Sequence, residues 1–276
     1  MHLDPETVRK LIADVAAREI TPRFRALSHG EVRQKKPGDL VTIADEAAEE
    51  RLEAALTALV PDSVCVGEEA AARDRGVLDV LQEHRPVWVI DPVDGTGNFA
   101  HGRTPFAVMV ALVEGGETLA AWIHDPIAGW TASAERGGGA WLNGERLQVA
   151  TPPADPLALR GTLHVGSHGN RGIQRQVNHG RNHLGVVKSQ RCAGAEYVML
   201  ARGEQDYGLF TKLEPWDHAP GALILTEAGG VARLLDGLPY SPGAPRTNGL
   251  LLAANEATWS RVYATLFGDA PATNEA

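Results

Sequence analysis

An apolar run ends in two closely spaced carboxylates in the stretch Trp88–Gly102, which reads WVIDPVDGTGNFAHG. The residues Val87–Ile90 predict a short buried strand, and Asp91 and Asp94 follow it three positions apart. Asp, Pro and Gly are common turn formers, so a plain loop is the simplest interpretation. The acidic residues at the ends of other predicted elements argue for more than a loop.

Carboxylates stand at the ends of predicted elements in four parts of the chain. Each one alone is more typical of a helix cap or a turn. Because strand ends meet at a shared edge of a sheet, we expect the four places to converge in the fold. Carboxylates collected there would repel one another without a counter-ion, and Mg²⁺ takes oxygen ligands of this kind. The residues are Asp45, Glu68, the pair Asp91 and Asp94, and Asp217.

The segment DPVDGT also carries the groups that a phosphate ester would need. The proline between Asp91 and Asp94 predicts a bend that lets both carboxylates face one side, with the Val93 carbonyl as a further oxygen ligand. Gly95 permits a backbone conformation that exposes its own amide and that of Thr96 to a phosphate. Metal ligands beside such amides indicate phosphoryl transfer.

Helix and strand patterns alternate along the remainder of the chain. The residues 105–147 form four apolar runs separated by EGGE, DPIAG and RGGG, which predicts an antiparallel meander. The segment TPPADP after Leu147 predicts a boundary between an N-terminal α+β subdomain, 1–150, with most of the metal ligands, and a C-terminal α/β subdomain, 151–276, that completes the site. Helical patterns lie near 5–16, 45–59, 73–85, 169–184, 192–203, 215–228 and 256–267, and further strand patterns near 40–44, 63–66, 160–167, 231–235 and 249–253.

Composition excludes several classes of partner. The chain of 276 residues carries a formal net charge of −9, so it lacks the basic excess that nucleic acid polymers require. No apolar run approaches the roughly 20 residues that span a bilayer, and the first residues do not form a secretory signal pattern. The two cysteines, Cys65 and Cys192, suit a reducing compartment. We therefore expect a cytoplasmic protein without nucleic acid or membrane partners.

Three segments, VGEEA, DPVDGTGNFAHG and EPWDHAPGALILTEAGG, resemble the signature segments of the inositol monophosphatase superfamily of Mg²⁺-dependent, lithium-sensitive phosphatases. The resemblance covers nearly the whole chain, from the first helix to the last strand. It implies a layered αβαβα sandwich of α+β and α/β character, with an antiparallel sheet in the N-terminal half. It also implies a homodimer and a small phosphorylated substrate.

The same resemblance implies a role for each residue of the site. Two or three Mg²⁺ ions would be bound, and Asp91 would bridge two of them. Asp45 and Thr96 would orient and activate the attacking water, and Glu68 would lie near a more weakly held third ion. The Gly95 and Thr96 amides would hold the phosphate beside Asp94. The implied metal ligands are Glu68, Asp91, the Val93 carbonyl, Asp94 and Asp217, and Ala193 would lie beside the substrate.

Two positions depart from the simple inositol monophosphatase pattern. Phe210 stands where those enzymes carry a Glu that contacts the sugar hydroxyls, so myo-inositol phosphate is expected to be a poor substrate. Arg191 stands in the turn near the substrate, where it could bind a second phosphate or remain a surface charge. Both departures concern the leaving group and leave the metal chemistry intact.

The function expected is therefore that of a phosphoric monoester hydrolase acting on a small, inositol monophosphate-like metabolite with metal-activated water. A 3′(2′),5′-bisphosphate nucleotidase, a fructose-1,6-bisphosphatase and a histidinol-phosphatase are alternatives within the family. A regulatory or binding protein without turnover is an alternative of another class, although it would have no need of the acidic set. The role of the His-rich segment 164–183 is left open; its histidines are His164, His168, His179 and His183.

Overall fold

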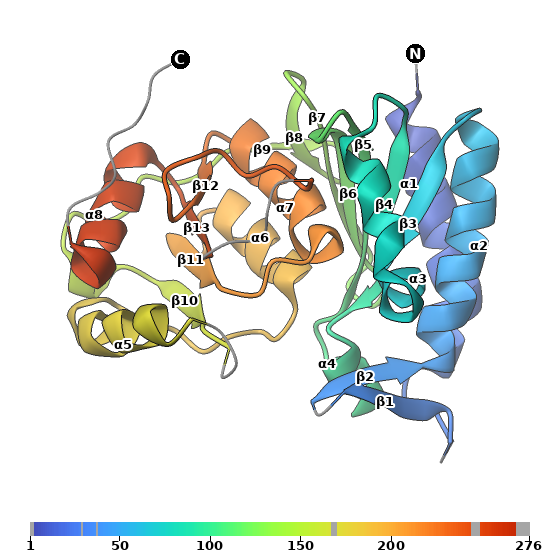
Figure 1. Ribbon diagram of the computed structural model, residues 1–276, viewed down its shortest axis with the longest axis horizontal. Helices are drawn as coiled ribbons and strands as arrows, with labels where there is room; N and C mark the ends of the chain where they lie inside the picture. Colours follow the sequence, from blue (N-terminus) through green and yellow to red (C-terminus); the bar gives the residue numbers. More distant parts are fainter. Residues whose placement is uncertain (1–2, 29, 37, 167–169, 244–248, 269–276) are drawn as a thin grey trace.

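Helices and sheets alternate in five layers in the computed structural model, which describes residues 3–28, 30–36, 38–166, 170–243 and 249–268 (Figure 1). The helices α1 and α2 cover one face of a seven-stranded sheet, and α6 and α7 lie between this sheet and a four-stranded one. The outer layer contains α5 and α8, so the expected αβαβα sandwich is confirmed. The helices are α1 (Pro5–Val15), α2 (Ile43–Leu59), α3 (Glu68–Arg73), α4 (Thr96–Ala100), α5 (Arg171–Gly180), α6 (Ala193–Ala201), α7 (Pro215–Glu227) and α8 (Glu256–Phe267).

The larger sheet has the strand order β3-β4-β5-β6-β7-β8-β9. Only the first pair is parallel, so the expected antiparallel meander is confirmed. The fourth apolar run is in fact two strands, because Asn143 and Gly144 have φ values of 50° and 87° and form a tight turn between them. The strands are β3 (Val64–Gly67), β4 (Val87–Asp94), β5 (Ala107–Glu114), β6 (Glu117–Asp125), β7 (Trp130–Glu135), β8 (Gly139–Leu142) and β9 (Glu145–Leu147).

The smaller sheet has the order β10-β11-β13-β12, in which β10 and β11 are parallel and the other pairs antiparallel. Its two faces are covered by different helices, α7 on one side and α8 on the other. This sheet lies within 161–253 and the larger one within 64–147; the division into two subdomains stays a prediction. The strands are β10 (Gly161–His164), β11 (Tyr207–Phe210), β12 (Val231–Leu234) and β13 (Leu250–Ala253).

A hairpin of β1 (Val32–Lys36) and β2 (Asp39–Thr42) was not expected from the sequence, where only its second strand has an extended pattern. Helix α2 begins two residues before the predicted start, because the Thr42 side chain caps it and Asp45 closes a capping box. Among the described residues, no helix combines the length and the apolar character that crossing a bilayer requires.

Strand β4 is buried along its entire length, which explains its continuous apolar sequence. Trp88 and Ile90 pack into the core beneath α1 and α2, whereas Val87 and Val89 pack on the opposite face. With both faces of the strand covered, its position is fixed, and the carboxylates at its end are held on a rigid support.

Candidate active site

The strand β4 does not end at Ile90 as predicted but continues through Asp94. Its pairing with β5 shifts between Asp91 and Asp94, so that one extra residue is accommodated there as a bulge. The Val93 amide donates to Asp91 Oδ1 at 3.0 Å, which fixes that carboxylate within the bulge. The bend expected from the proline therefore occurs inside the strand, where pairing with β5 still holds the backbone.

Three carboxylates converge at this bulge. Asp91, Asp94 and Asp217 each place an oxygen within 4.8 Å of the others, although Asp217 comes from the first turn of α7. Burial and the negative charge of its neighbours raise the pKa of Asp91 well above its usual range. Burial likewise raises the pKa of Asp217, to about 8, against the opposing effect of nearby Lys212. Oxygen ligands that repel one another in a buried place fit a hard divalent cation, which would relieve the repulsion.

Asp94 joins the β4 bulge to α6. Its Oδ1 accepts from the Ala193 amide at 3.1 Å, and its Oδ2 accepts from the Gly194 amide at 2.7 Å and from Cys192 Sγ at 2.9 Å. A carboxylate at the start of a helix is also favoured by the helix dipole. Ala193 thus lies beside the acidic cluster, and its place beside a substrate stays a prediction. Both cysteines are free.

Asp45 and Thr96 lie together, and the role of this pair toward a water molecule stays a prediction. Thr96 Oγ1 is 3.1 Å from Asp45 Oδ1 and 2.9 Å from the Val93 carbonyl oxygen, so its single proton is shared between two acceptors. The second oxygen of Asp45 accepts from the Thr42 amide and hydroxyl at 2.8 and 2.6 Å. Burial raises the pKa of Asp45 to about 7, in the range that suits a proton acceptor at neutral pH.

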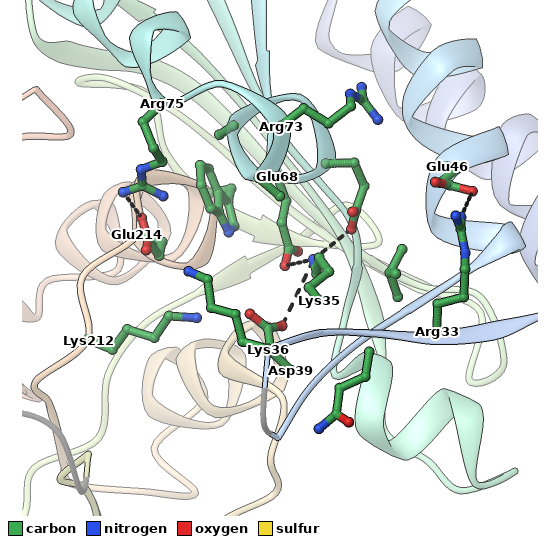
Figure 2. A pocket seen from close by; sticks show the side chains of 16 residues that line it. Arg33, Lys35, Lys36, Asp39, Glu46, Glu68, Arg73, Arg75, Lys212 and Glu214 are labelled. Carbon is green, nitrogen blue, oxygen red and sulfur yellow. Dashed lines mark hydrogen bonds and ion pairs between the residues drawn. The ribbon is translucent and has the colours of Figure 1, made fainter.

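Glu68 lies at the edge of the cluster and not within it. Figure 2 shows its side chain meeting Lys35 from the β1–β2 hairpin, and Lys35 Nζ contacts Glu68 Oε1 at 2.7 Å and Glu69 Oε1 at 2.9 Å. Although burial acts in the opposite direction, these two carboxylates raise the pKa of Lys35. The negative charge of Glu68 still reaches Asp91, whose pKa it helps to raise. Sequence reasoning missed Lys35, because only the folded hairpin brings it to this place.

A cavity of about 370 Å³ opens beside the carboxylates, and we call it the leaving-group cavity. It brings together Arg191, Phe210 and Ala193, the substrate residues expected from the sequence. It also holds Lys212 and His164, neither of which was assigned to the site. The only signal for Lys212 was its place five residues before Asp217.

Of the other described histidines in the His-rich segment, neither His179 nor His183 lines this cavity. His179 lies in the last turn of α5 and His183 in the following helical turn, Arg181–His183, whereas His168 lies outside the described residues. Within the part of the chain that the structure describes, the three aspartates are the only acidic, His and Cys group arranged for a metal ion.

Gly95 makes the turn from β4 into α4, and its φ of 86° lies in the left-handed region. A Cβ here would also lie 3.2 Å from the carbonyl oxygens of Arg191 and Pro105. We expect Gly95→Ala to lower the free energy of unfolding by about 1–2 kcal/mol or more, the cost of this conformation for L-residues. Chemical denaturation measures it. Gly97→Ala is the matched control, because its Cβ would meet no atom within 4 Å; an equal loss in both variants would contradict the assignment.

Stabilisation by Mg²⁺ should depend on pH. An aspartate whose pKa is raised in the folded protein stays protonated at pH values above 3.8, its ordinary pKa. The pKa of Asp217 is raised to about 8, so its carboxyl stays protonated up to about pH 8. A cation must displace that proton, so we expect the rise in Tm on adding Mg²⁺ to be larger at pH 8 than at pH 6. Comparing each sample with its EDTA-treated partner cancels the titration of buried histidines elsewhere. A shift in Tm that is equal at the two pH values would contradict this view of the site.

Comparisons with known proteins agree with this geometry. The model of the inositol monophosphatase family matches residues 4–269. The chain is 35% identical to an inositol-1-monophosphatase of Mesorhizobium japonicum over 229 residues, 80% of this chain and 82% of that protein. It is 32% identical to a fructose-1,6-bisphosphatase/inositol-1-monophosphatase of Aquifex aeolicus over 84% of this chain and 86% of that one. The solved structure of extragenic suppressor protein SuhB from Bartonella henselae superposes with a TM-score of 0.81 at 25% identity, covering 95% of this chain and 98% of that one.

The fold is that of a family of metal-dependent phosphoric monoester hydrolases, and its acidic cluster is arranged so that it could hold a metal ion. The chain belongs to the inositol monophosphatase family. It is accordingly an enzyme, and the family acts on small phosphorylated substrates.

Proposed function

We propose that the protein is a Mg²⁺-dependent phosphomonoesterase that hydrolyses a small phosphorylated metabolite by direct attack of water. The observation that carries this proposal is the convergence of Asp91, Asp94 and Asp217 within 4.8 Å of one another in a buried place. The ligands of the ions would be these three carboxylates with Glu68 and the Val93 carbonyl. Bound Mg²⁺ would supply a Lewis acid for the phosphoryl group and lower the pKa of a coordinated water.

The chain's own groups then account for the other requirements of the reaction. Asp45 accepts the proton of the attacking water, and Thr96, 3.1 Å away, orients that water. Gly95 is the N-cap of α4 and Thr96 is its first residue, so their amides have no acceptor within the helix, and they hold the phosphate. No covalent phospho-enzyme is needed, because the water is the nucleophile.

The leaving group lies in the leaving-group cavity, between Ala193 and Phe210. Phe210 offers no acceptor for a sugar hydroxyl, which disfavours inositol monophosphate itself. One relative is named for both fructose-1,6-bisphosphate and inositol phosphate, so the family tolerates different alcohols. Nucleoside bisphosphates and histidinol phosphate stay in the set of substrates to test, and we also propose a homodimer.

Phosphate release from a generic phosphomonoester tests the proposal. We expect hydrolysis with Mg²⁺, loss of activity in EDTA, recovery when excess Mg²⁺ is restored, and inhibition by Li⁺. A screen of inositol 1-phosphate, fructose 1,6-bisphosphate, adenosine 3′,5′-bisphosphate and histidinol phosphate then ranks the substrates. Activity that persists at full rate in EDTA would rule out the metal-dependent mechanism.

A further inference from the structure

His164 lies on the wall of the leaving-group cavity and is held there by a buried carboxylate. Its Nε2 is 2.6 Å from Glu196 Oε2, and the Glu196 side chain is 1% exposed whereas that of His164 is 27% exposed. The imidazole also stacks on Phe210, with ring centroids 4.4 Å apart and planes 3° apart. A hydrogen bond at one nitrogen and a stacked ring together fix the orientation of the side chain.

Glu196 accepts hydrogen bonds on both oxygens. Thr162 Oγ1 donates at 2.7 Å, Ser189 Oγ at 2.9 Å and the Gln190 amide at 2.8 Å. Although burial acts in the opposite direction, the hydrogen bonds from His164, Thr162 and Ser189 lower the pKa of Glu196. Glu196 is therefore a carboxylate that only accepts, so His164 Nε2 carries the hydrogen of this bond.

The other ring nitrogen of His164, Nδ1, is left for a ligand. Among the described residues it has no hydrogen-bond partner, yet it is not one of the buried unsatisfied atoms, so it is open to the cavity. The second histidine of the cavity, His218, differs in this respect. Both of its nitrogens are used, one by Tyr197 and one by the Lys212 carbonyl, and burial lowers its pKa to about 4.

Apart from the proposed metal ligands, the charged side chains that line the cavity with His164 are positive. Arg191 lines the same cavity, and no described carboxylate pairs with its guanidinium group. Lys212 also lines it, and although burial acts in the opposite direction, the neighbouring carboxylates, Asp217 first among them, raise the pKa of Lys212. Asp94 and Asp217 are the acidic residues of the cavity, and bound cations would neutralise both.

We infer that His164, positioned by Glu196, is a specificity-determining residue that binds a second anionic group on the alcohol part of the substrate, together with Arg191 and Lys212. The inference rests on the proposed function and names its substrate class, a compact phosphate ester that carries a further phosphate or carboxylate. When His164 carries a proton on each ring nitrogen, Nε2–H donates to Glu196 and Nδ1–H donates to such a group, and Phe210 provides an apolar floor beside it. A neutral polyol phosphate gains nothing from these cations.

Two pairs of esters test the inference, each matched except for the second charge. Fructose 1-phosphate and fructose 1,6-bisphosphate test a second phosphate, and glycerol 2-phosphate and 2-phosphoglycerate test a carboxylate. In the wild type we expect kcat/KM to be about tenfold higher for the ester with the second anionic group in at least one pair. This is the factor that one charge-assisted hydrogen bond contributes, and we expect it to act mainly by lowering KM. The pair that shows the preference identifies the anionic group.

His164→Gln retains an amide that can donate to Glu196 and removes Nδ1. We expect its kcat/KM to fall about tenfold more for the charged ester than for the neutral one. Arg191→Asn, which suits the left-handed backbone at this position (φ 56°), should act in the same direction and does not depend on how His164→Gln folds. Arg175→Gln on α5 removes an exposed charge outside the cavity and should leave the preference as it is.

The inference is overturned if the wild type prefers neither charged ester. It is also overturned if neither variant changes the preference, or if His164→Gln loses more activity with the neutral polyol, since Nδ1 would then accept from a hydroxyl. Hydrolysis of all four esters at similar rates would overturn this inference while leaving the phosphatase intact. Release of phosphate from none of them with Mg²⁺ would instead refute the proposed function.

Discussion

Asp91→Asn is expected to lower kcat by at least about 100-fold, because the loss of a Lewis acid costs several kcal/mol of transition-state stabilisation. The same change should leave the metal-free protein as stable as the wild type or more stable. Asn keeps the oxygen that accepts from the Val93 amide and removes a buried carboxyl whose ionisation burial and its acidic neighbours oppose. A melting curve in EDTA and an assay in Mg²⁺ measure the two effects.

Asp94→Asn is the informative comparison. Asp94 accepts from Ala193 on one oxygen and from Cys192 and Gly194 on the other, so the NH2 group of an asparagine would face at least one of these donors and leave it without an acceptor. This variant should lose activity and stability together, by about 1–3 kcal/mol for a buried group left unsatisfied. Full activity of Asp91→Asn, or a loss of stability equal to that of Asp94→Asn, would contradict the roles given to the two residues.

Thr96→Val should lower kcat by about 100-fold, in the range that general acid–base groups contribute. Valine has nearly the shape of threonine, but it lacks the hydroxyl that lies between Asp45 and the Val93 carbonyl. Thr96→Ser restores the hydroxyl and is expected to recover most of the activity. Steady-state kinetics at saturating Mg²⁺ measures kcat of both variants. A Thr96→Val variant with the kcat of the wild type would contradict the role given to Thr96.

The sequence was informative where a local pattern has a single physical cause. Short Gly-rich turns between apolar runs predicted the meander, and carboxylates at element ends predicted a convergent site. The Asn143-Gly144 turn was overlooked although its dipeptide is a strong hairpin signal. The β4 boundary was wrong because a bulge lets the strand continue past the proline, which a rule based on turn residues does not anticipate.

Residues that act through distant partners could not be predicted in this way. Lys35 meets Glu68 only because the β1–β2 hairpin folds over α3, and β1 has no alternating apolar pattern. His164 was noted within a His-rich segment, yet its partner Glu196 lies 32 positions away on another element. Side chains of this kind become visible only when the packing of α6 against the sheets is known.

Asp91, Asp94 and Asp217 are proposed to hold divalent cations together. Crystals soaked in Mn²⁺, a substitute for Mg²⁺ with an anomalous signal, test it directly. We expect anomalous difference peaks about 2 Å from these carboxylate oxygens, the distance of Mg²⁺–oxygen bonds, and a weaker or missing peak in Asp91→Asn crystals. Crystals of active protein that show no peak among the three carboxylates would contradict the account.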